Sequence, residues 1–371
     1  MSRELLGLVF IAVLCIIVAP FFKENNIPNN RRVFTKKIKV PYNTTMAQAN
    51  SPKKIVLLTQ SFLPTTFAGS ELSAYETIKY LRLRGHTIII FTNKWSVNEY
   101  DGFKIYKYDD SEEFCKTEIL NADYVFFQMD HTYKNMELIN QRKNDVFIFI
   151  HLIDSNPWLL QQKTSFPLTV VYNSNMTQDT LPTLHTNMRM IPYVNTEKFT
   201  EIRNYTADNQ TVCLVNCNQN KGGSLLLHLA EKMPDVQFIG VKGGYSSQIV
   251  DTSFENIKYV ENQKDIASVY KKVGILIMPS KNETWGRTAV EAMASGIPVI
   301  HSESPGLVEC VGGAGILCPY NDEEAWMNAI RKLLSDKKYR ENLRLYGYKR
   351  VEEIEIEQKR GQQELTMKIE A

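Results

Sequence analysis

The sequence predicts an α/β protein in which two Rossmann-like domains face each other across a cleft, preceded by an N-terminal transmembrane anchor. Three observations lead to this prediction. A chain of 371 residues is too long for one ordinary hydrophobic core. A strand–helix–strand pattern begins near Lys53 and begins again at Thr211. An uncharged apolar run at Leu5–Phe22 has about the length that crosses a bilayer core of roughly 30 Å.

The composition is that of a globular protein and excludes several classes of partner. Hydrophobic residues make up 43% of the chain and charged residues 23%, which argues against a disordered or fibrous protein. A net charge of +2 gives no large field of one sign, so we expect no nucleic-acid partner. The six cysteines fit neither a zinc ribbon nor a Cys-x-x-Cys pair. We therefore expect buried thiols, and the spacing leaves a single Cys310–Cys318 bridge open.

The apolar run at residues 1–22 favours an uncleaved signal anchor over a cleaved signal peptide, because no small-x-small pattern follows it. The predicted location is therefore a membrane, reached through a single N-terminal span. The side of the membrane stays open. Basic residues after the span favour a cytosolic catalytic domain. Asn-x-Ser/Thr acceptors suit a lumenal domain in the Golgi or endoplasmic reticulum of a eukaryote; they begin at Asn43, Asn175, Asn204, Asn209 and Asn282.

Residues 23–52 are polar and predict a linker, and residues 53–192 predict the first domain. A buried strand begins at Lys53, and a turn-rich loop leads to a helix over Glu71–His86 that Gly85 ends. We expect this helix to bury one face, made by Leu72, Tyr75, Ile78, Lys79 and the stem of Arg82. A strand then completes the unit at Thr87–Thr92. Further strands are predicted at Tyr124–Gln128, Val146–His151 and Leu168–Asn173, with a helix at Tyr133–Lys143.

Residues 193–371 predict a second domain of the same kind, followed by a terminal helix. It opens with a strand at Thr211–Asn216, a loop, a helix at Ser224–Met233 and a strand at Val236–Val241. The pattern continues with helices at Asp265–Val273, Arg287–Ser295 and Asp322–Ser335, strands at Gly274–Ser280 and Val299–Ser302, and a charged helix from about Lys338. Two such openings about one domain length apart favour twin parallel sheets over one large sheet.

The most informative segment is Ser280–Pro298, where two carboxylates stand eight residues apart at a strand–loop–helix junction. Glu283 falls in the loop after a parallel strand, the place where such sheets bind ligands, and Glu291 falls on the second helical turn. Carboxylates there can accept hydrogen bonds from sugar hydroxyls. The free N–H groups of Gly286, Arg287 and Thr288 open the helix, whose positive end suits a phosphate.

This segment resembles the Glu-x7-Glu motif of the retaining glycosyltransferases of family four, the group 1 family with the GT-B fold. The resemblance covers the chain from Lys53 to about Asp336 and includes the trailing Ala-Ser-Gly-Ile-Pro-Val. It implies that Glu291 binds the ribose hydroxyls of a nucleotide and that Glu283 faces the transferred sugar. The alternative for this pair is a solvated loop carboxylate and a charge on a helix surface.

Other loops add candidate ligands of a diphosphate. Lys221 lies in the loop Asn-Gln-Asn-Lys-Gly-Gly at a helix start, where an ammonium group and free N–H groups can hold phosphates. The family pairs this lysine with an arginine at the position of Asn216, which can donate hydrogen bonds but carries no charge. Either Arg287 replaces that arginine or donor affinity is weaker. The alternative for Lys221 is an exposed lysine.

Three further residues match weaker family features. Gly69 lies between the first strand and helix, where it would let the backbone approach a β-phosphate or only serve the turn. Gly306 resembles part of the family's donor-sugar loop. His151 ends a strand where the family carries a histidine near the reacting sugar, and its alternative is a core imidazole. The predicted catalytic residues are therefore His151 and Glu283.

The predicted function is transfer of a sugar from a nucleotide-diphosphate donor to a glycan, lipid or protein acceptor. The resemblance implies retention of anomeric configuration, with no metal and no cofactor beyond the nucleotide sugar as co-substrate. The sequence has no Asp-x-Asp triplet that would chelate an ion with the diphosphate. Two alternatives stay open, a nucleotide-sugar epimerase and a non-catalytic sugar-nucleotide-binding protein, the latter because of Asn216.

Overall fold

The computed structural model describes residues 48–49, 51–128, 138, 141, 145–153, 160–206, 208–262 and 264–371. The predicted anchor at Leu5–Phe22, nearly all of the predicted linker and nearly all of the helix predicted at Tyr133–Lys143 lie outside these residues. Within the described ranges, no helix is both long enough and apolar enough to cross a membrane. Residues Met46–Ala371 form one compact unit, to which the following description applies.

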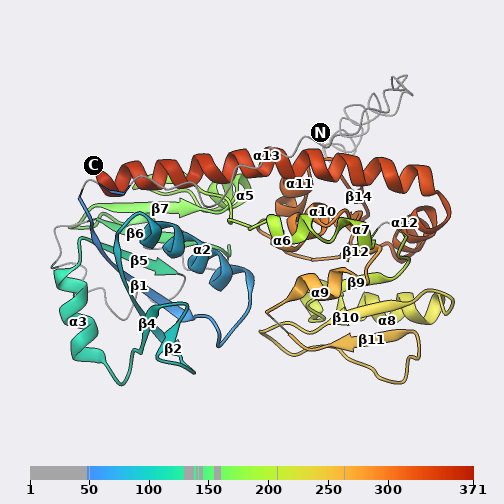
Figure 1. The fold of residues 1–371 in the computed structure, drawn as a ribbon, viewed down its shortest axis with the longest axis horizontal. Coiled ribbons are helices and arrows are strands. Elements are labelled where there is room, and N and C mark those ends of the chain that lie inside the picture. The colour runs from blue at the N-terminus through green and yellow to red at the C-terminus, as the bar shows by residue number, and fades with distance from the viewer. Residues whose placement is uncertain are drawn as a thin grey trace, which may run out of the picture. The chain divides into compact units, whose positions relative to one another are not determined.

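The first half of this unit is built on an eight-stranded sheet in the order β3-β4-β2-β1-β5-β6-β7-β8 (Figure 1). All neighbours pair in parallel except β3 and β4. Numbered along the chain, the parallel strands β4-β2-β1-β5-β6-β7 have the order 3-2-1-4-5-6 of a Rossmann sheet. The strands are β1 (Lys54–Ser61), β2 (Thr87–Lys94), β3 (Glu99–Tyr100), β4 (Phe103–Lys107), β5 (Tyr124–Gln128), β6 (Val146–Ile150), β7 (Leu168–Tyr172) and β8 (Thr186–Arg189).

The second half repeats this order in a six-stranded parallel sheet, β11-β10-β9-β12-β13-β14. The prediction of a second Rossmann-like sheet is therefore confirmed, and the strands are β9 (Val212–Val215), β10 (Phe238–Val241), β11 (Ile257–Val260), β12 (Ile275–Met278), β13 (Val299–His301) and β14 (Ile316–Leu317). The connecting helices are α8 (Gly223–Lys232), α9 (Ile266–Tyr270), α10 (Arg287–Ala294), α11 (Pro305–Val311) and α12 (Glu323–Ser335).

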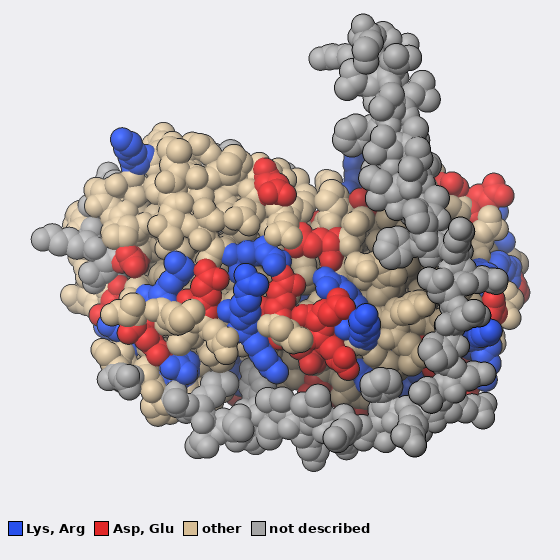
Figure 2. All heavy atoms as spheres, turned by 90° about the horizontal axis from the view of Figure 1, so that it is seen from above, with Lys and Arg blue, Asp and Glu red and all other residues tan. Residues whose placement is uncertain are grey.

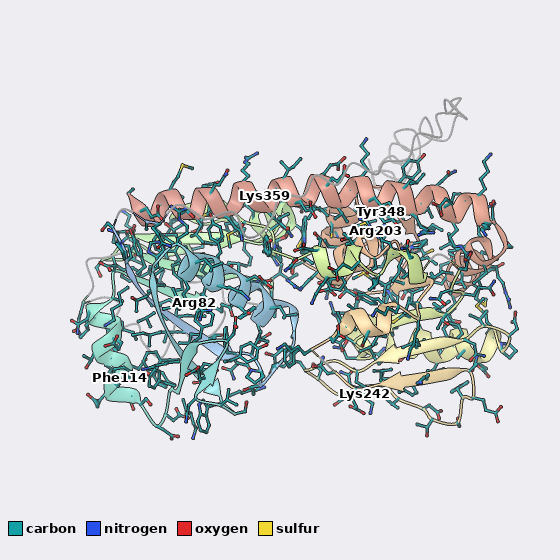
Figure 3. The ribbon with its side chains drawn as sticks, in the orientation of Figure 1. Arg82, Phe114, Arg203, Lys242, Tyr348 and Lys359 are labelled. Carbon is teal, nitrogen blue, oxygen red and sulfur yellow. The ribbon has the colours of Figure 1, made fainter. Side chains whose placement is uncertain are left out.

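Helix α2 (Gly69–Leu83) ends as the sequence predicts but buries a broader face than expected. Gly85 after it adopts a left-handed φ of +98°, which ends the helix. Of the five expected members, Ile78 is buried, and Leu72 and Tyr75 are partly buried and pack against the same core. Small side chains let the helix lie close to the sheet, and the buried residues are Glu71, Ser73, Ala74, Thr77, Ile78 and Leu81. Arg82 instead stacks on the ring of Phe103 at 3.8 Å, on the flank of the helix (Figure 3).

The other helices of the first half are α3 (Glu112–Asn121) and α5 (Asn175–Thr180), and the segment that leads to β9 carries α6 (Glu197–Thr200) and α7 (Arg203–Thr206). Arg203 packs its guanidinium at 3.8 Å over the ring of Tyr348 on the C-terminal helix, as Figure 3 shows. Its Nε donates to the carbonyl of Ala294, the last residue of α10, at 2.9 Å. The connecting segment is thereby fixed to the second half.

The C-terminal helix α13 (Lys337–Glu370) contacts both halves. Its residues Val351 and Ile354 belong to the core of the second sheet, whereas Leu365 and Ile369 belong to the core of the first. Arg84, just after α2, donates two hydrogen bonds of 2.7 Å to the carboxylate of Glu370. The division at residues 192 and 193 stays a prediction, and the end of α13 is a part of the first core that the sequence did not predict.

The exposed face along which α13 runs carries charges of both signs, interspersed as Figure 2 shows. The net charge of +2 predicts no large electrostatic field of one sign, and this distribution agrees with that prediction.

The five described cysteines are free and buried, as expected. The Cys310–Cys318 bridge left open by the sequence is not formed, because the two thiols belong to different core clusters.

Candidate functional site

Several of the predicted ligand residues lie at the two points where strand order reverses, between β1 and β5 in the first sheet and between β9 and β12 in the second, whereas His151 follows β6 and Gly306 follows β13. At such a point neighbouring connections leave the sheet in opposite directions, which opens a crevice beside the carboxyl ends of the strands. Gly69 follows β1, Asn216 and Lys221 follow β9, and Glu283 follows β12. The fold therefore brings the predicted residues to the edges where ligands of such sheets bind.

The loops after β9 and β12 are held together by backbone and side-chain hydrogen bonds. Asn220 accepts from Lys281 N at 2.8 Å and exchanges side-chain to backbone bonds with Asn282 at 3.1 and 3.2 Å. Gly222 takes a left-handed φ of +91°, and a Cβ there would lie 2.3 Å from Cγ of Pro279. The close approach therefore requires glycine at this position.

Lys221 and Glu283 meet across these two loops. Lys221 Nζ forms an ion pair with Glu283 Oε2, and both side chains are mostly buried. Asn218 accepts from Lys221 N at 2.9 Å and so fixes the short turn that carries the lysine. The alternatives of an exposed lysine and a solvated glutamate do not describe this pair. The two residues that the sequence assigned to phosphate and sugar are in direct contact.

Helix α10 begins as predicted, with Gly286 as its N-cap in a left-handed conformation, φ +112°. A Cβ on Gly286 would lie 2.7 Å from a methyl group of Leu307, so the sharp turn into the helix requires glycine. The first intrahelical donors are the N–H groups of Ala289 and Val290. Those of Arg287 and Thr288 in the first turn precede them and have no intrahelical acceptor.

Glu291 lies buried on α10 and is not a surface charge. Its Oε1 accepts from Arg287 Nε at 3.1 Å, and its Oε2 accepts from Tyr270 OH at 3.3 Å. Burial first, and the Glu291 charge second, raise the pKa of Tyr270 well above its usual value. The Arg287 guanidinium also donates to the carbonyl of Tyr193. Arg287 is therefore committed to Glu291 and to the segment between the two sheets.

Asn216 takes part in the organisation of a neighbouring loop. It adopts a left-handed φ of +72°, which asparagine tolerates better than most residues. Its Oδ1 accepts from Gln248 Nε2 at 3.1 Å, while Gln248 Oε1 accepts from Gly243 N at 2.8 Å. A Cβ on Gly243 would lie 2.2 Å from Asn216 Oδ1. The Asn216 carbonyl oxygen therefore has a partner within the protein, and phosphate binding by this residue stays a prediction.

The loop from Gly243 to Gln248 reaches residues of the first half. Tyr245 OH donates to Glu71 in the first turn of α2, and Glu71 is buried. Burial raises the pKa of Glu71, although the Tyr245 hydroxyl opposes that shift. Gly69, two residues before Glu71, has nothing within 4 Å of the position of a Cβ. The turn geometry therefore does not require glycine at position 69. The space beside this residue is open.

His151 lies next to the loop that carries Glu283. Its carbonyl accepts from Thr284 Oγ1 at 2.7 Å, and Asn173 Nδ2 donates to the same hydroxyl oxygen at 3.0 Å. Together with Phe126 and Phe149, His151 lines a pocket of about 430 Å³, part of it open to solvent. Burial lowers the pKa of His151 to about 4. The ring is therefore neutral at pH 7, and His151 lies at a pocket wall.

Gly306 packs directly on the Glu283 loop. A Cβ on Gly306 would lie 2.3 Å from the carbonyl oxygen of Glu283 and 2.3 Å from the carbonyl carbon of Thr284. Ser304 Oγ accepts from Glu283 N at 2.8 Å and donates to Glu283 O at 3.1 Å. This packing places the start of α11 against the loop, and contact of Gly306 with a ligand stays a prediction.

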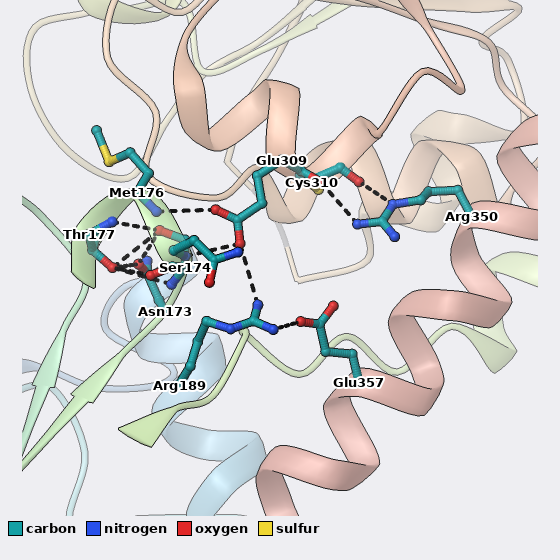
Figure 4. A network of polar contacts seen from close by, with 10 residues as sticks. Asn173, Ser174, Met176, Thr177, Arg189, Glu309, Cys310, Arg350 and Glu357 are labelled. Carbon is teal, nitrogen blue, oxygen red and sulfur yellow. Dashed lines mark hydrogen bonds and ion pairs between the residues drawn. The ribbon is translucent and has the colours of Figure 1, made fainter. Parts of the chain in front are cut away.

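A second polar network, drawn in Figure 4, connects α11 with the first sheet and with α13. Glu309 accepts from the N–H groups of Asn175 at 3.0 Å and Met176 at 3.2 Å, at the start of α5. Arg189 lies between Glu309 and Glu357 and forms ion pairs with both. Sequence reasoning did not find these residues, nor Tyr270, Gln128 or Tyr245, because their partners are distant in the chain and belong to no motif.

The comparisons with known proteins point to one family. Residues 194–350 match the family model described as glycosyl transferases group 1. A D-inositol 3-phosphate glycosyltransferase of Corynebacterium urealyticum is 39% identical over 75 residues, which are 20% of this chain and 18% of that protein. The capsular polysaccharide biosynthesis glycosyltransferase CapM of Staphylococcus aureus is 30% identical over 103 residues, 27% of each protein. The matches span about a quarter or less of the length of these two relatives.

Solved structures share the fold over most of the chain. Sucrose-phosphate synthase from Thermosynechococcus elongatus superposes with a TM-score of 0.67 at 16% identity, over 86% of this chain and all of that one. HepE of Anabaena in complex with UDP-glucose gives a TM-score of 0.66 at 17% identity, over 85% of this chain and all of that one. At such identities the likeness shows the fold alone, which is the GT-B arrangement of two Rossmann-like sheets.

Proposed function

We propose that this chain, whose residues 194–350 belong to the group 1 glycosyl transferases, moves a sugar from a nucleotide-diphosphate donor to a glycan, lipid-linked or protein acceptor. The observation that carries the proposal is the contact of Lys221 with Glu283. This contact brings together a cation that can bind a phosphate and a carboxylate that can accept a hydrogen bond from a sugar hydroxyl. Both lie beside the first turn of α10. HepE of Anabaena, which shares this fold, forms a complex with UDP-glucose, which supports a ligand of this class.

The diphosphate end of the donor would lie between Lys221 and the first turn of α10. As the bond from the anomeric carbon to the phosphate oxygen breaks, negative charge grows on the diphosphate. An ammonium group and free N–H groups at a helix start stabilise that charge without rearrangement. When the donor binds, Lys221 would either give up part of its contact with Glu283 or donate hydrogen bonds to both the carboxylate and the phosphate. Gly69, with open space beside it, lets backbone approach the phosphate from the first sheet.

The nucleoside end would lie at Glu291. Each carboxylate oxygen carries two lone pairs, and the protein uses one on each oxygen, through Arg287 and Tyr270. The remaining lone pairs can accept hydrogen bonds from the two ribose hydroxyls. Arg287 and Tyr270 hold the carboxylate in one orientation. The directions in which its remaining lone pairs can accept hydrogen bonds are therefore set before a ligand arrives.

The transfer itself is proposed to retain the anomeric configuration and to need no metal. The acceptor oxygen attacks the anomeric carbon on the face from which the diphosphate leaves, and the acceptor proton moves to the departing phosphate oxygen. One carbon–oxygen bond forms as the other breaks, and the leaving group is a nucleoside diphosphate. Glu283 accepts from a hydroxyl of the transferred sugar and holds it in place for this step.

We also propose that Leu5–Phe22 anchors the catalytic unit in a membrane. The support is the uncharged apolar run in the sequence and the absence of a small-x-small cleavage pattern after it. Either side of the membrane is compatible with the sequence. Fractionation of cells that express the tagged chain, with and without carbonate washing, tests the anchor. Recovery of the full-length chain in the carbonate supernatant would overturn it.

The catalytic proposal is tested by a thermal-shift screen of the purified full chain against nucleotide sugars that differ in base and sugar. We expect at least one to raise the melting temperature by several degrees. Glu291→Gln keeps the shape of the side chain but weakens its bonds to hydroxyl groups, so it should reduce that shift. Asn282→Ala, at an exposed position in the loop before α10, is the control and should leave it intact. No shift with any nucleotide sugar would overturn the proposal.

A further inference from the structure

The side-chain amide of Gln128 lies between the first helix and the candidate histidine. Gln128 ends β5 and is buried. Its Nε2 lies 3.1 Å from the carbonyl oxygen of Ser70 and 3.2 Å from Nε2 of His151. Its Oε1 lies 3.0 Å from the Thr59 hydroxyl on β1. One amide thus connects the end of β5 with β1, with the start of α2 and with the residue after β6.

The orientation of this amide follows from its partners. The Ser70 carbonyl can only accept a hydrogen bond, so the amide atom facing it has to be the NH₂ group. The reverse orientation would place two carbonyl oxygens against each other at this partly buried contact, which is costly. The Thr59 hydroxyl at the other end of the amide can donate or accept, and it also lies 2.9 Å from the carbonyl oxygen of Ser61, so it fits either orientation. The Ser70 carbonyl therefore decides the orientation.

The proton position on His151 follows in turn. Gln128 Nε2 carries two hydrogens, one directed to Ser70 O, and the second is available to His151 Nε2. A nitrogen that accepts this hydrogen cannot carry a proton of its own. The neutral ring therefore has its proton on Nδ1. Among the described residues, Nδ1 of His151 has no hydrogen-bond partner.

We propose that Gln128 is a positioning residue that holds His151 as the neutral tautomer protonated on Nδ1, so that the Nδ1–H group donates to an oxygen of the sugar being transferred. This role rests on the proposed function. Its support is the position of His151 at a pocket wall, bonded through its carbonyl to Thr284, the residue after Glu283. A neutral donor adds no charge beside the carboxylate of Glu283. The two residues would hold different hydroxyl groups, one as donor and one as acceptor.

The tautomer can be observed without any substrate. Long-range ¹H–¹⁵N correlation spectra of the full chain, labelled at histidine, distinguish a protonated ring nitrogen from an unprotonated one. The His151 signals are assigned by their loss in His151→Gln. We expect Nδ1 protonated and Nε2 unprotonated at pH 7. A protonated Nε2 in the unmodified chain would overturn the proposal, and this result does not depend on whether the chain is a glycosyltransferase.

Two variants test the cause. Gln128→Glu has nearly the same shape but presents acceptors where the amide presents donors, so we expect a proton on His151 Nε2. Thr59→Val is the matched control, because it removes the hydroxyl at the other end of the amide and leaves Ser70 and His151 in place. An unchanged tautomer in Gln128→Glu, or a changed one in Thr59→Val, would contradict the assignment. If Gln128→Glu does not fold, Gln128→Met replaces it and should give a mixture of tautomers.

The role in catalysis has its own readout. With a nucleotide sugar found in the thermal-shift screen, we expect Gln128→Glu to lower the kcat of donor turnover roughly 10-fold to 100-fold with little change in KM. A tautomer that changes while kcat does not would overturn the role of His151 as donor. The absence of any binding nucleotide sugar would instead count against the proposed function, and it would leave the assigned tautomer untouched.

Discussion

Lys221, from the loop after β9, forms an ion pair with Glu283, from the loop after β12. The two loops leave neighbouring strands at the point where the order of the second sheet reverses, and a ladder of hydrogen bonds through Asn220 holds them together. The sequence separates these residues by 62 positions, yet the fold places them in contact. A cation and a carboxylate in one place can address the phosphate and the sugar of the same ligand.

Replacement of Lys221 by alanine should lower turnover of the donor and cost some stability. Both side chains of the pair are mostly buried, so removal of the lysine leaves Glu283 without its partner and should reduce the free energy of unfolding by about 1–3 kcal/mol. Loss of a charge that stabilises the leaving group should reduce kcat about 100-fold. Steady-state release of nucleoside diphosphate measures this. Lys281→Ala, an exposed neighbour, is the control. Equal losses in the two variants would contradict a specific role for Lys221.

Replacement of Glu291 by alanine should destabilise the protein, whereas Asn282→Ala should not. The truncation leaves Tyr270 OH and Arg287 Nε without their partner inside the protein. Each buried unsatisfied group costs about 1–3 kcal/mol. Urea unfolding monitored by tryptophan fluorescence gives the difference. An unfolding midpoint equal to that of the unmodified chain would show that Glu291 does not hold these groups.

The two glycines of the site should respond in opposite ways to alanine. Gly69→Ala should keep or raise stability, by about 0.5–1 kcal/mol, because nothing lies near the added methyl and alanine favours the helix. It should nevertheless weaken nucleotide-sugar binding if a phosphate approaches this backbone. Gly306→Ala should destabilise by about 1–3 kcal/mol, because its Cβ would lie 2.3 Å from Glu283 O. Thermal melts of both variants measure the change in stability, and binding titrations measure the affinity for the nucleotide sugar. If Gly69→Ala bound the nucleotide sugar as tightly as the unmodified chain, a close approach of the phosphate to the Gly69 backbone would be excluded.

The contact of Arg84 with Glu370 should make the docking of α13 sensitive to acid. The Arg84 hydrogen bonds lower the pKa of Glu370 from its usual 4.5. A carboxyl whose pKa is lower in the folded protein stabilises it above the unfolded value, and this contribution disappears as the pH falls through the folded pKa. Glu370→Gln should therefore be less stable than the unmodified chain at pH 7, with the difference shrinking as the pH falls below 4.5 and vanishing below the folded pKa of Glu370. A difference that is constant from pH 7 to pH 3 would contradict this.

Local patterns were sufficient to predict the central strands of both sheets, but not β3, β4, β8, β11 and β14. Continuous apolar runs such as Ile55–Leu58 and Ile275–Met278 indicate strands covered on both faces, and those strands are buried. The helix end predicted at Gly85 was also correct, because that glycine takes a left-handed φ of +98°. The edge proposed to bind the ligand followed from the parallel order of the strands.

Features that depend on distant partners could not be predicted. Part of the buried face of α2 was missed because small residues such as Ala74 and Thr77 bring the helix close to the sheet, whereas a hydrophobicity pattern favours larger ones. The end of α13 was missed because Leu365 and Ile369 stand among charged residues and find their apolar partners in the first sheet. The tautomer of His151 depends on Ser70 and Gln128, which are neighbours only in the folded protein.

The most direct test of the account is hydrogen–deuterium exchange of the full chain with and without the nucleotide sugar that gives the largest thermal shift. The account predicts slower exchange in the loops at residues 62–69, 216–223 and 280–288, at the carboxyl ends of β1, β9 and β12. Slower exchange confined to other surfaces, with these three loops unchanged, would contradict a donor site formed by Lys221, Glu283 and the start of α10.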